Sequence, residues 1–207
     1  MARERRNSPA FSLPKFLQKP EFRKDSLGTG FLKKLYFTRQ QRLTLLRWGS
    51  YALLCLAALV LQDTIMSRIS IFGAGTDLPV AAMLLITVLE GTETGSIYIL
   101  IASTIYYFSG SAPGPYTVAL LTVLGICASL FRQVYWHRSR SSILLCAGIA
   151  VMVYEIAVFG FSIFSGLTYW GRFPRFAVTG ILSWAAMFLM YPLTLRFGQI
   201  GGHTWKE

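Results

Sequence analysis

The chain has 207 residues, a length that suggests one domain or at most two. Hydrophobic residues make up 54% of it and charged residues only 14%, whereas an average soluble domain carries roughly 25% charged residues. This composition argues against a soluble globule and against a disordered chain. The net charge of +11 is concentrated at one end, because 12 of the 20 basic residues lie within positions 1–47. The distribution favours a membrane protein whose basic segment meets lipid, and it disfavours nucleic acid as a partner.

Residues 1–42 are predicted to form a basic arm on the cytoplasmic side of the membrane. Its first part, residues 1–26, holds three prolines among basic and polar residues, which is typical of a flexible segment. Residues 30–42 can place their apolar side chains on one helical face, as in an interfacial helix that binds anionic lipid. The alternative is a basic stop that only orients the first span. The basic region is too long for a cleavable signal peptide, so we expect the first span to be retained.

Apolar runs in the rest of the chain predict an all-α integral membrane protein with six transmembrane helices of uneven length. In chain order the runs are 43–61, 78–89, 97–108, 116–131, 143–164 and 176–195, with the last bent or ended near Pro192.

The number of spans depends on residues 78–108, which could form one long tilted helix or two short helices. Two helices joined by residues 90–95 keep the basic loop 132–140 on the same side as the arm, as the positive-inside rule requires. Six spans then place both termini in the cytoplasm, with residues 43–197 as the membrane domain and 198–207 as a tail. The external loop 166–175 is the exception, because it contains two arginines.

The second and third predicted spans are shorter than the roughly 20 residues that a bilayer requires. We expect them to be shielded by neighbouring helices or to face a locally thinned bilayer. Gly91 and Gly95, at the turn between them, are interpreted as a helix end and tight loop. The alternative is a close-packing notch of small residues, a pattern that Gly125 and Ser129 also fit.

Two external turns have a structural interpretation. Asp77 precedes Leu78 and Pro79, and an acid at the N-cap with proline in the first turn is typical of a helix start. Gly114 lies in the uncharged stretch 109–115, which is expected to close the third span and open the fourth.

The search for catalytic and metal-binding residues finds no complete set. His137 and His203 lie outside the predicted spans, which disfavours an intramembrane Ser-His protease. No phosphate-binding or dinucleotide-binding glycine motif and no metal-ligand spacing are present. Cys55, Cys127 and Cys146 fall in apolar runs and are interpreted as small buried or lipid-facing residues. We therefore expect no enzymatic activity, no cofactor and no metal.

Glu155 lies near the midpoint of the fifth predicted span, where a carboxylate is costly. It is expected to be protonated or paired across the bundle. One interpretation is a proton or ligand site. The other is a neutral acid that donates a hydrogen bond to a Ser, Thr or Tyr of another helix.

The order of these features over residues 48–197 resembles the rod shape-determining protein MreD family. Members tend to show a P-D-L-like entry to the second span, glycines four apart before the third, and an L-G-x-Y-like start to the fourth. The corresponding residues here are Asp77-Leu78, Gly91 with Gly95, and Gly114-Pro115-Tyr116. This chain lacks the acid that the family commonly carries at the end of the third span, and its basic arm is unusually long.

The resemblance implies a non-enzymatic subunit of the cell-wall elongation machinery in the plasma membrane of a bacterium. It implies a fold similar to the substrate-binding subunits of energy-coupling-factor vitamin transporters. It also implies association with a bitopic MreC-like partner, and through it with MreB, RodA and a transpeptidase. We expect that contact to form through membrane helices, with close approach at the small residues Ala102, Ser103, Gly125 and Ser129.

The alternative is a vitamin-binding subunit of such a transporter. It would need a polar or aromatic pocket open to the outside, which could be lined by Tyr106, Tyr107, Tyr116, Tyr169, Trp170 and Asp77. Against it, the first span offers no clean A-x3-A pair for docking to an energising partner. A neighbouring gene for an MreC-like protein or for a cassette ATPase would discriminate the two.

Overall fold

The structure is a computed structural model that describes residues 39–66, 74–135 and 139–200. The chain divides into two units, Met1–Phe37 and Thr38–Glu207, and all described residues belong to the second. The predicted flexible segment 1–26, both histidines and most of the tail 198–207 lie outside the described residues. Of the predicted interfacial helix 30–42, only residues 39–42 are described, and they form the first turn of a longer helix.

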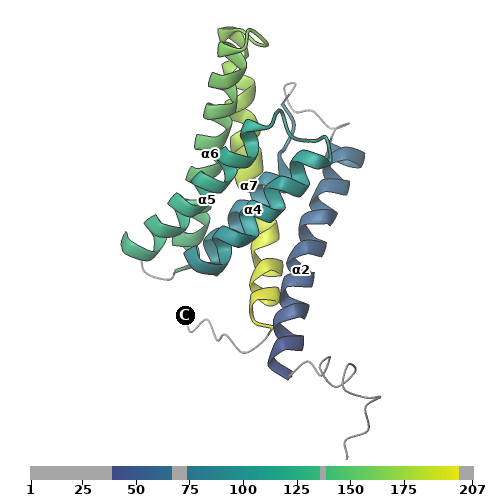
Figure 1. Cartoon of the computed structure of the whole chain (residues 1–207). Coiled ribbons are helices and arrows are strands. Elements are labelled where there is room, and N and C mark those ends of the chain that lie inside the picture. The colour runs from purple at the N-terminus through teal and green to yellow at the C-terminus, as the bar shows by residue number, and fades with distance from the viewer. Residues whose placement is uncertain (1–38, 67–73, 136–138, 201–207) are drawn as a thin grey trace, which may run out of the picture. The chain divides into compact units, whose positions relative to one another are not determined.

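The described residues form six α-helices (Figure 1). They are α2 (Arg39–Leu61), α3 (Leu78–Glu90), α4 (Thr92–Phe108), α5 (Tyr116–Tyr135), α6 (Arg140–Phe164) and α7 (Phe173–Gly198). A π-helical turn, η2 (Gln62–Met66), extends α2, and a 3-10 turn, η3 (Trp170–Arg172), leads into α7. Four of the helices, α2, α5, α6 and α7, are long and apolar enough to cross a bilayer. The chain is therefore an all-α membrane protein, as its composition predicts.

Residues 78–108 form two helices rather than one long helix. Gly91 separates α3 from α4 with φ +93°, a backbone conformation that glycine adopts without strain. The two-helix interpretation of this segment is thus confirmed. At the other end of the chain, α7 continues through Pro192 to Gly198, so the helix does not end at the proline.

The short helix α3 lies at the centre of the bundle. All of its residues from Pro79 to Leu89 are buried, and α2, α4, α5, α6 and α7 all pack against it. A helix that is apolar on every face belongs in such a position. Its 13 residues do not have to span lipid, because protein surrounds them. The expected shielding therefore holds for α3, whereas α4 has an outward apolar face with Ile97, Leu100, Ile101 and Ile105 exposed.

Two glycines allow α4 and α5 to approach α3 closely. A Cβ atom on Gly95 would lie 2.6 Å from the carbonyl oxygen of Thr87. A Cβ atom on Gly125 would overlap Cδ1 of Ile99 and lie 3.2 Å from Cγ2 of Thr87. Small residues at such positions let helices pack at backbone distance. Gly91 therefore matches the interpretation as a turn, and Gly95 matches the interpretation as a close-packing position. Gly125 is also a close-packing position, but the helices that it approaches belong to the same chain.

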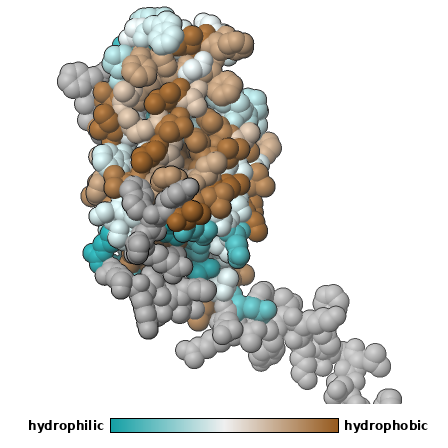
Figure 2. Space-filling view, turned by 90° about the vertical axis from the view of Figure 1, so that its left-hand side faces the viewer, coloured by the Kyte–Doolittle hydropathy of each residue, from teal (hydrophilic) through white to brown (hydrophobic). Residues whose placement is uncertain are grey.

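Apolar side chains cover the outer surface of α5 and α6. Figure 2 shows them as a broad band on the face that includes these helices, with hydrophilic residues gathered below it. The exposed apolar residues of α5 and α6 include Val123, Leu130, Val134, Ile149, Val153 and Ile156. A contiguous apolar surface of this extent is what lipid contact requires.

The topology gives the first testable prediction. In Figure 1, α2 begins and α7 ends at the same end of the helical unit. In a background without native cysteines, Ser111→Cys should react with an impermeant thiol reagent on intact cells. Ser139→Cys should react only after permeabilisation, because the positive-inside rule predicts a cytoplasmic position for its loop. The reverse pattern, or equal labelling of both, would contradict six spans with cytoplasmic termini.

Candidate functional site

A polar cavity of about 510 Å³ opens at one end of the bundle. Its walls come from η2, the C-terminal parts of α4 and α6, the starts of α3 and α7, and the loops that connect them. The helices that lead into the cavity are anchored to one another. The backbone N–H of Asp77 donates to Ser183 Oγ of α7 at 2.7 Å, and the N–H of Leu78 donates to Gln62 Oε1 of η2 at 3.2 Å. These bonds satisfy backbone donors at the start of α3 that have no intrahelical partner.

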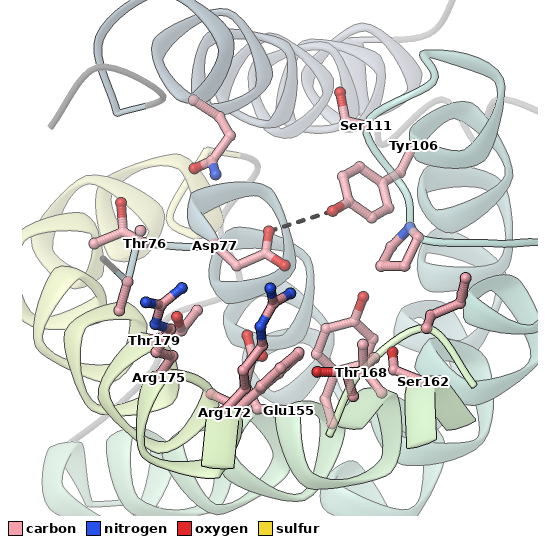
Figure 3. A pocket seen from close by; sticks show the side chains of 18 of the residues that line it. Thr76, Asp77, Tyr106, Ser111, Glu155, Ser162, Thr168, Arg172, Arg175 and Thr179 are labelled. Atoms are coloured by element: carbon pink, nitrogen blue, oxygen red, sulfur yellow. Dashed lines mark hydrogen bonds between the residues drawn. The ribbon is translucent and has the colours of Figure 1, made fainter. Parts of the chain in front are cut away.

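Asp77 stands at the N-cap position of α3, with Pro79 in the first turn, but its side chain makes no capping hydrogen bond. Instead, Oδ1 accepts a hydrogen bond from the Tyr106 hydroxyl at 3.4 Å (Figure 3). Burial raises the pKa of Asp77 to about 6, and the bond from Tyr106 works in the opposite direction. The carboxyl group that the sequence assigns to a helix start therefore faces the cavity.

Glu155 reaches the same cavity from α6. The residue is only 5% exposed, and its Oε1 atom has no hydrogen-bond partner among the described residues. No hydrogen bond to a Ser, Thr or Tyr of another helix satisfies this oxygen. A buried polar atom left without a partner is costly and calls for an explanation.

Arg172 and Arg175 line the cavity from η3 and the first turn of α7. Figure 3 shows both side chains directed into the space that Asp77 also faces. The guanidinium carbon of Arg172 lies 5.2 Å from the centre of the Tyr169 ring, so an aromatic face supports that side chain. Within the described part of the chain, no ion pair within 4.0 Å joins either arginine to Asp77 or Glu155. Opposite charges therefore share the cavity without neutralising one another directly.

A buried ionic network lies where α2 begins and α3 ends. Nη2 of Arg47 is 3.6 Å from Oε2 of Glu90, with side chains 9% and 4% exposed. The Tyr51 hydroxyl donates to Oε1 of Glu90 at 2.6 Å. Close by, Nη2 of the buried Arg132 is 3.5 Å from the carbonyl oxygen of Leu89. From the sequence, Glu90 was placed in a connecting loop and this network was not predicted. Neither Arg47 nor Glu90 belongs to a recognisable catalytic or ligand-binding pattern.

An apolar groove of about 580 Å³ lies between α2 and α4. From α2 it is lined by Trp48, Ala52, Cys55, Leu56 and Leu59, and from α4 by Thr94, Ile97, Tyr98, Ile101, Ala102 and Ile105. The groove is bordered by exposed aliphatic side chains, so it opens on the surface that faces lipid.

The structure separates the four residues that were expected to contact a partner helix. Ala102 lines the α2–α4 groove. Ser103 is fully buried, with its hydroxyl 3.2 Å from the carbonyl oxygen of Leu100. Gly125 and Ser129 are buried on α5. Of the four, only Ala102 lines the α2–α4 groove, and it is itself 6% exposed.

The aromatic residues considered for an external pocket are also separated. Tyr106 lines the cavity with Asp77, whereas Tyr107 is exposed beside Phe108. Tyr116 stacks on Phe161 with ring centroids 4.7 Å apart. Tyr169 supports Arg172, and Trp170 is 76% exposed with its edge against Phe159.

The absence of a side chain at Gly114 leaves space for the ring of Tyr116, because a Cβ atom there would lie 2.7 Å from Cε1 of Tyr116.

Cys55 and Cys146 are buried and Cys127 is exposed, and all three are free thiols. Among the residues that the structure covers, no group of three or more His, Cys, Asp or Glu side chains could hold a metal ion.

Comparison with known proteins finds no family model, no curated protein and no solved structure that matches this chain. The geometry defines an all-α membrane protein with a polar cavity at one end and an apolar groove on its flank.

Proposed function

We propose that this chain is a non-enzymatic membrane subunit of the bacterial cell-wall elongation complex, and that it acts by binding an MreC-like partner. In this proposal it crosses the plasma membrane six times with both termini in the cytoplasm. Through the partner it contributes to the regulation of cell shape and peptidoglycan synthesis by MreB, RodA and a transpeptidase. The basis is the ordered resemblance to the MreD family over residues 48–197.

The α2–α4 groove is the observation that carries the proposal. Apolar side chains cannot drive helices together in lipid, where association depends on close packing and on small residues that permit it. The groove offers a concave apolar surface with small residues, Ala52 and Ala102, on its two sides. A single transmembrane helix of a bitopic partner is the occupant that this shape favours.

The position of α3 favours α4 as the helix that the partner contacts. The short hairpin of α3 and α4 is the part of the bundle that fits a bilayer least well. Because five helices of this chain already surround α3, a partner can reach the hairpin only at the outward face of α4. That face includes Ile97, Ile101 and Ile105, which also line the groove.

Site-specific crosslinking tests the proposal. A photoreactive side chain at Ile101, in the groove, should crosslink in native membranes to a single-span MreC-like protein. The same group at Ile149, exposed on the lipid-facing side of α6, should not. Crosslinks to the partner from Ile149 alone would place the interface elsewhere.

Filling the groove should weaken the complex. Ala102→Trp is expected to reduce recovery of the partner roughly tenfold, the effect of losing about 1.4 kcal/mol at a packed contact. Ala128→Trp is the matched control, because Ala128 lines a separate apolar depression between α5 and α6. Because Ala102 is only 6% exposed, the folded yield of each variant must be shown to equal that of the unaltered chain before partner recovery is compared. Equal recovery of the partner with Ala102→Trp and with the unaltered chain would remove the groove from the interface.

The polar cavity favours a second candidate function, the vitamin-binding subunit of an energy-coupling-factor transporter. Such a subunit requires an external ligand pocket, and a cavity of about 510 Å³ with charged and aromatic walls meets that requirement. Co-purification separates the two functions, since a transporter subunit would be recovered with a cassette ATPase instead of an MreC-like protein.

A further inference from the structure

The cavity at the outer end of the bundle is lined by acidic and basic side chains that do not all neutralise one another. Asp63, Asp77 and Glu155 contribute carboxyl groups, and Arg172 and Arg175 contribute guanidinium groups, with Tyr106 and Tyr154 as the other titratable side chains. Asp63 is engaged by the hydroxyl of Ser111 at 3.4 Å. Asp77 accepts a hydrogen bond from Tyr106 through Oδ1. Because a carboxylate can accept several hydrogen bonds, Asp77, Glu155 and the two arginines can still bind a ligand.

The acidic wall lies deep. Glu155 is 95% buried, with Oε1 unpartnered within the described part of the chain. The position of Asp77 is fixed before any ligand enters, because its N–H donates to Ser183 Oγ and the N–H of the next residue, Leu78, donates to Gln62 Oε1. A rigid, desolvated pair of carboxyl groups gains most from a cationic group that can also donate hydrogen bonds.

The basic wall lies at the mouth. Arg172 and Arg175 are exposed, and they line the cavity from η3 and from the first turn of α7. A guanidinium group presents a planar fork of donors that matches the two oxygens of a carboxylate. The ring of Tyr169 supports Arg172 and so reduces the freedom lost when it binds.

The arrangement excludes several ligand classes. The acidic wall would repel a polyanion such as a nucleotide. No group of metal-ligating side chains of the required size occurs among the described residues, so a bare metal ion is not favoured. A wholly apolar molecule would leave Glu155 unpartnered. The volume of about 510 Å³ suits a small organic molecule, with Val158 and Phe176 available for its apolar part.

We propose that this cavity binds a small zwitterion, with its protonated amine at Glu155 and Asp77 and its carboxylate at Arg172 and Arg175. The inference rests on the cavity and not on the partner complex, so either can fail without the other. Binding would supply the missing partner of Glu155 and bridge the two charged walls, which do not reach one another.

The test uses the full chain in lipid nanodiscs, with unfolding temperature and calorimetry as readouts. The probes are free amino acids and simple dipeptides at millimolar concentration. Each is compared with its N-acetyl derivative, which lacks the cation, and its C-terminal amide, which lacks the anion. At least one zwitterion should stabilise the protein, and both of its single-charge derivatives should bind more weakly. Stabilisation by no zwitterion, or equal binding of a derivative, would overturn the proposal.

Variants identify the site. Glu155→Gln and Arg172→Gln should each weaken binding of the stabilising probe by about 10- to 100-fold, the range expected for a lost charged hydrogen bond. Glu93→Gln, an exposed acid in the first turn of α4, should leave binding unchanged. Arg172 is exposed, so its variant provides the test even if Glu155→Gln fails to fold. Unchanged binding in Arg172→Gln would overturn the assignment.

Discussion

Replacing Arg47 by methionine is expected to destabilise the bundle by about 3–5 kcal/mol, the usual cost of breaking a buried ion pair. The pair joins α2 to the end of α3, with 3.6 Å between Arg47 Nη2 and Glu90 Oε2. Methionine keeps much of the side-chain volume but leaves the Glu90 carboxylate buried without a cation. The hydroxyl of Tyr51 is then the only neighbour among the described residues with a hydrogen bond to that carboxylate. The fall in thermal stability and in folded yield should be measured in detergent and in nanodiscs.

A double variant distinguishes a lost charge partner from lost packing. Arg47→Met combined with Glu90→Leu should recover much of the stability, because apolar residues can replace a buried ion pair at little cost. Recovery should be incomplete, since Tyr51 loses its acceptor. Arg42→Met, an exposed change on the same helix, should shift stability by less than about 0.5 kcal/mol. A double variant as unstable as the sum of the two single variants would contradict this account of the pair.

Gly125→Leu is expected to cost about 1–3 kcal/mol or more, because the added side chain overlaps Ile99 and meets Thr87. Relief of that overlap requires the fully buried Ile99 to change its side-chain conformation, or α5 to move away from α3 and α4. Gly160→Leu is the matched control on α6, since a Cβ atom there meets nothing within 4 Å. The control should be neutral or slightly stabilising, because leucine favours the helix more than glycine does.

The Gly125→Leu variant also distinguishes packing within the chain from contact with a partner as the role of Gly125. If the glycine serves packing within the chain, Gly125→Leu should reduce folded yield in a host without any partner protein. A variant that folds normally alone and loses only the partner would instead place Gly125 at the partner interface.

The helices were predictable because their signal is local. Apolar runs indicate spans within a few residues of their observed bounds, and the position of basic residues distinguishes two short helices from one long helix at 78–108. The buried position of α3 follows the same logic, because the sequence of this helix is apolar on every face. Its shortness indicated either shielding by neighbouring helices or a locally thinned bilayer, and the structure shows the shielding.

The cavity was not predictable in the same way, because segments far apart in the chain form it. Asp77, Glu155 and Arg172 come from α3, α6 and η3 and have no shared sequence pattern. One signal was present, because the predicted six-span topology places Arg172 and Arg175 outside, against the positive-inside rule. Charges that oppose a strong topological preference indicate a role other than orientation. The side chain of Asp77 was assigned to a cap because its spacing before Pro79 fits one, yet Tyr106 competes for it in three dimensions.

The central claim is that this chain acts by binding a bitopic partner in the membrane. Its most direct test is purification of the tagged full chain from native membranes in mild detergent, followed by identification of the proteins recovered in stoichiometric amount. The account predicts an MreC-like single-span protein, lost in Ala102→Trp and retained in Ala128→Trp. Recovery of a cassette ATPase in its place would contradict the account and support the transporter function.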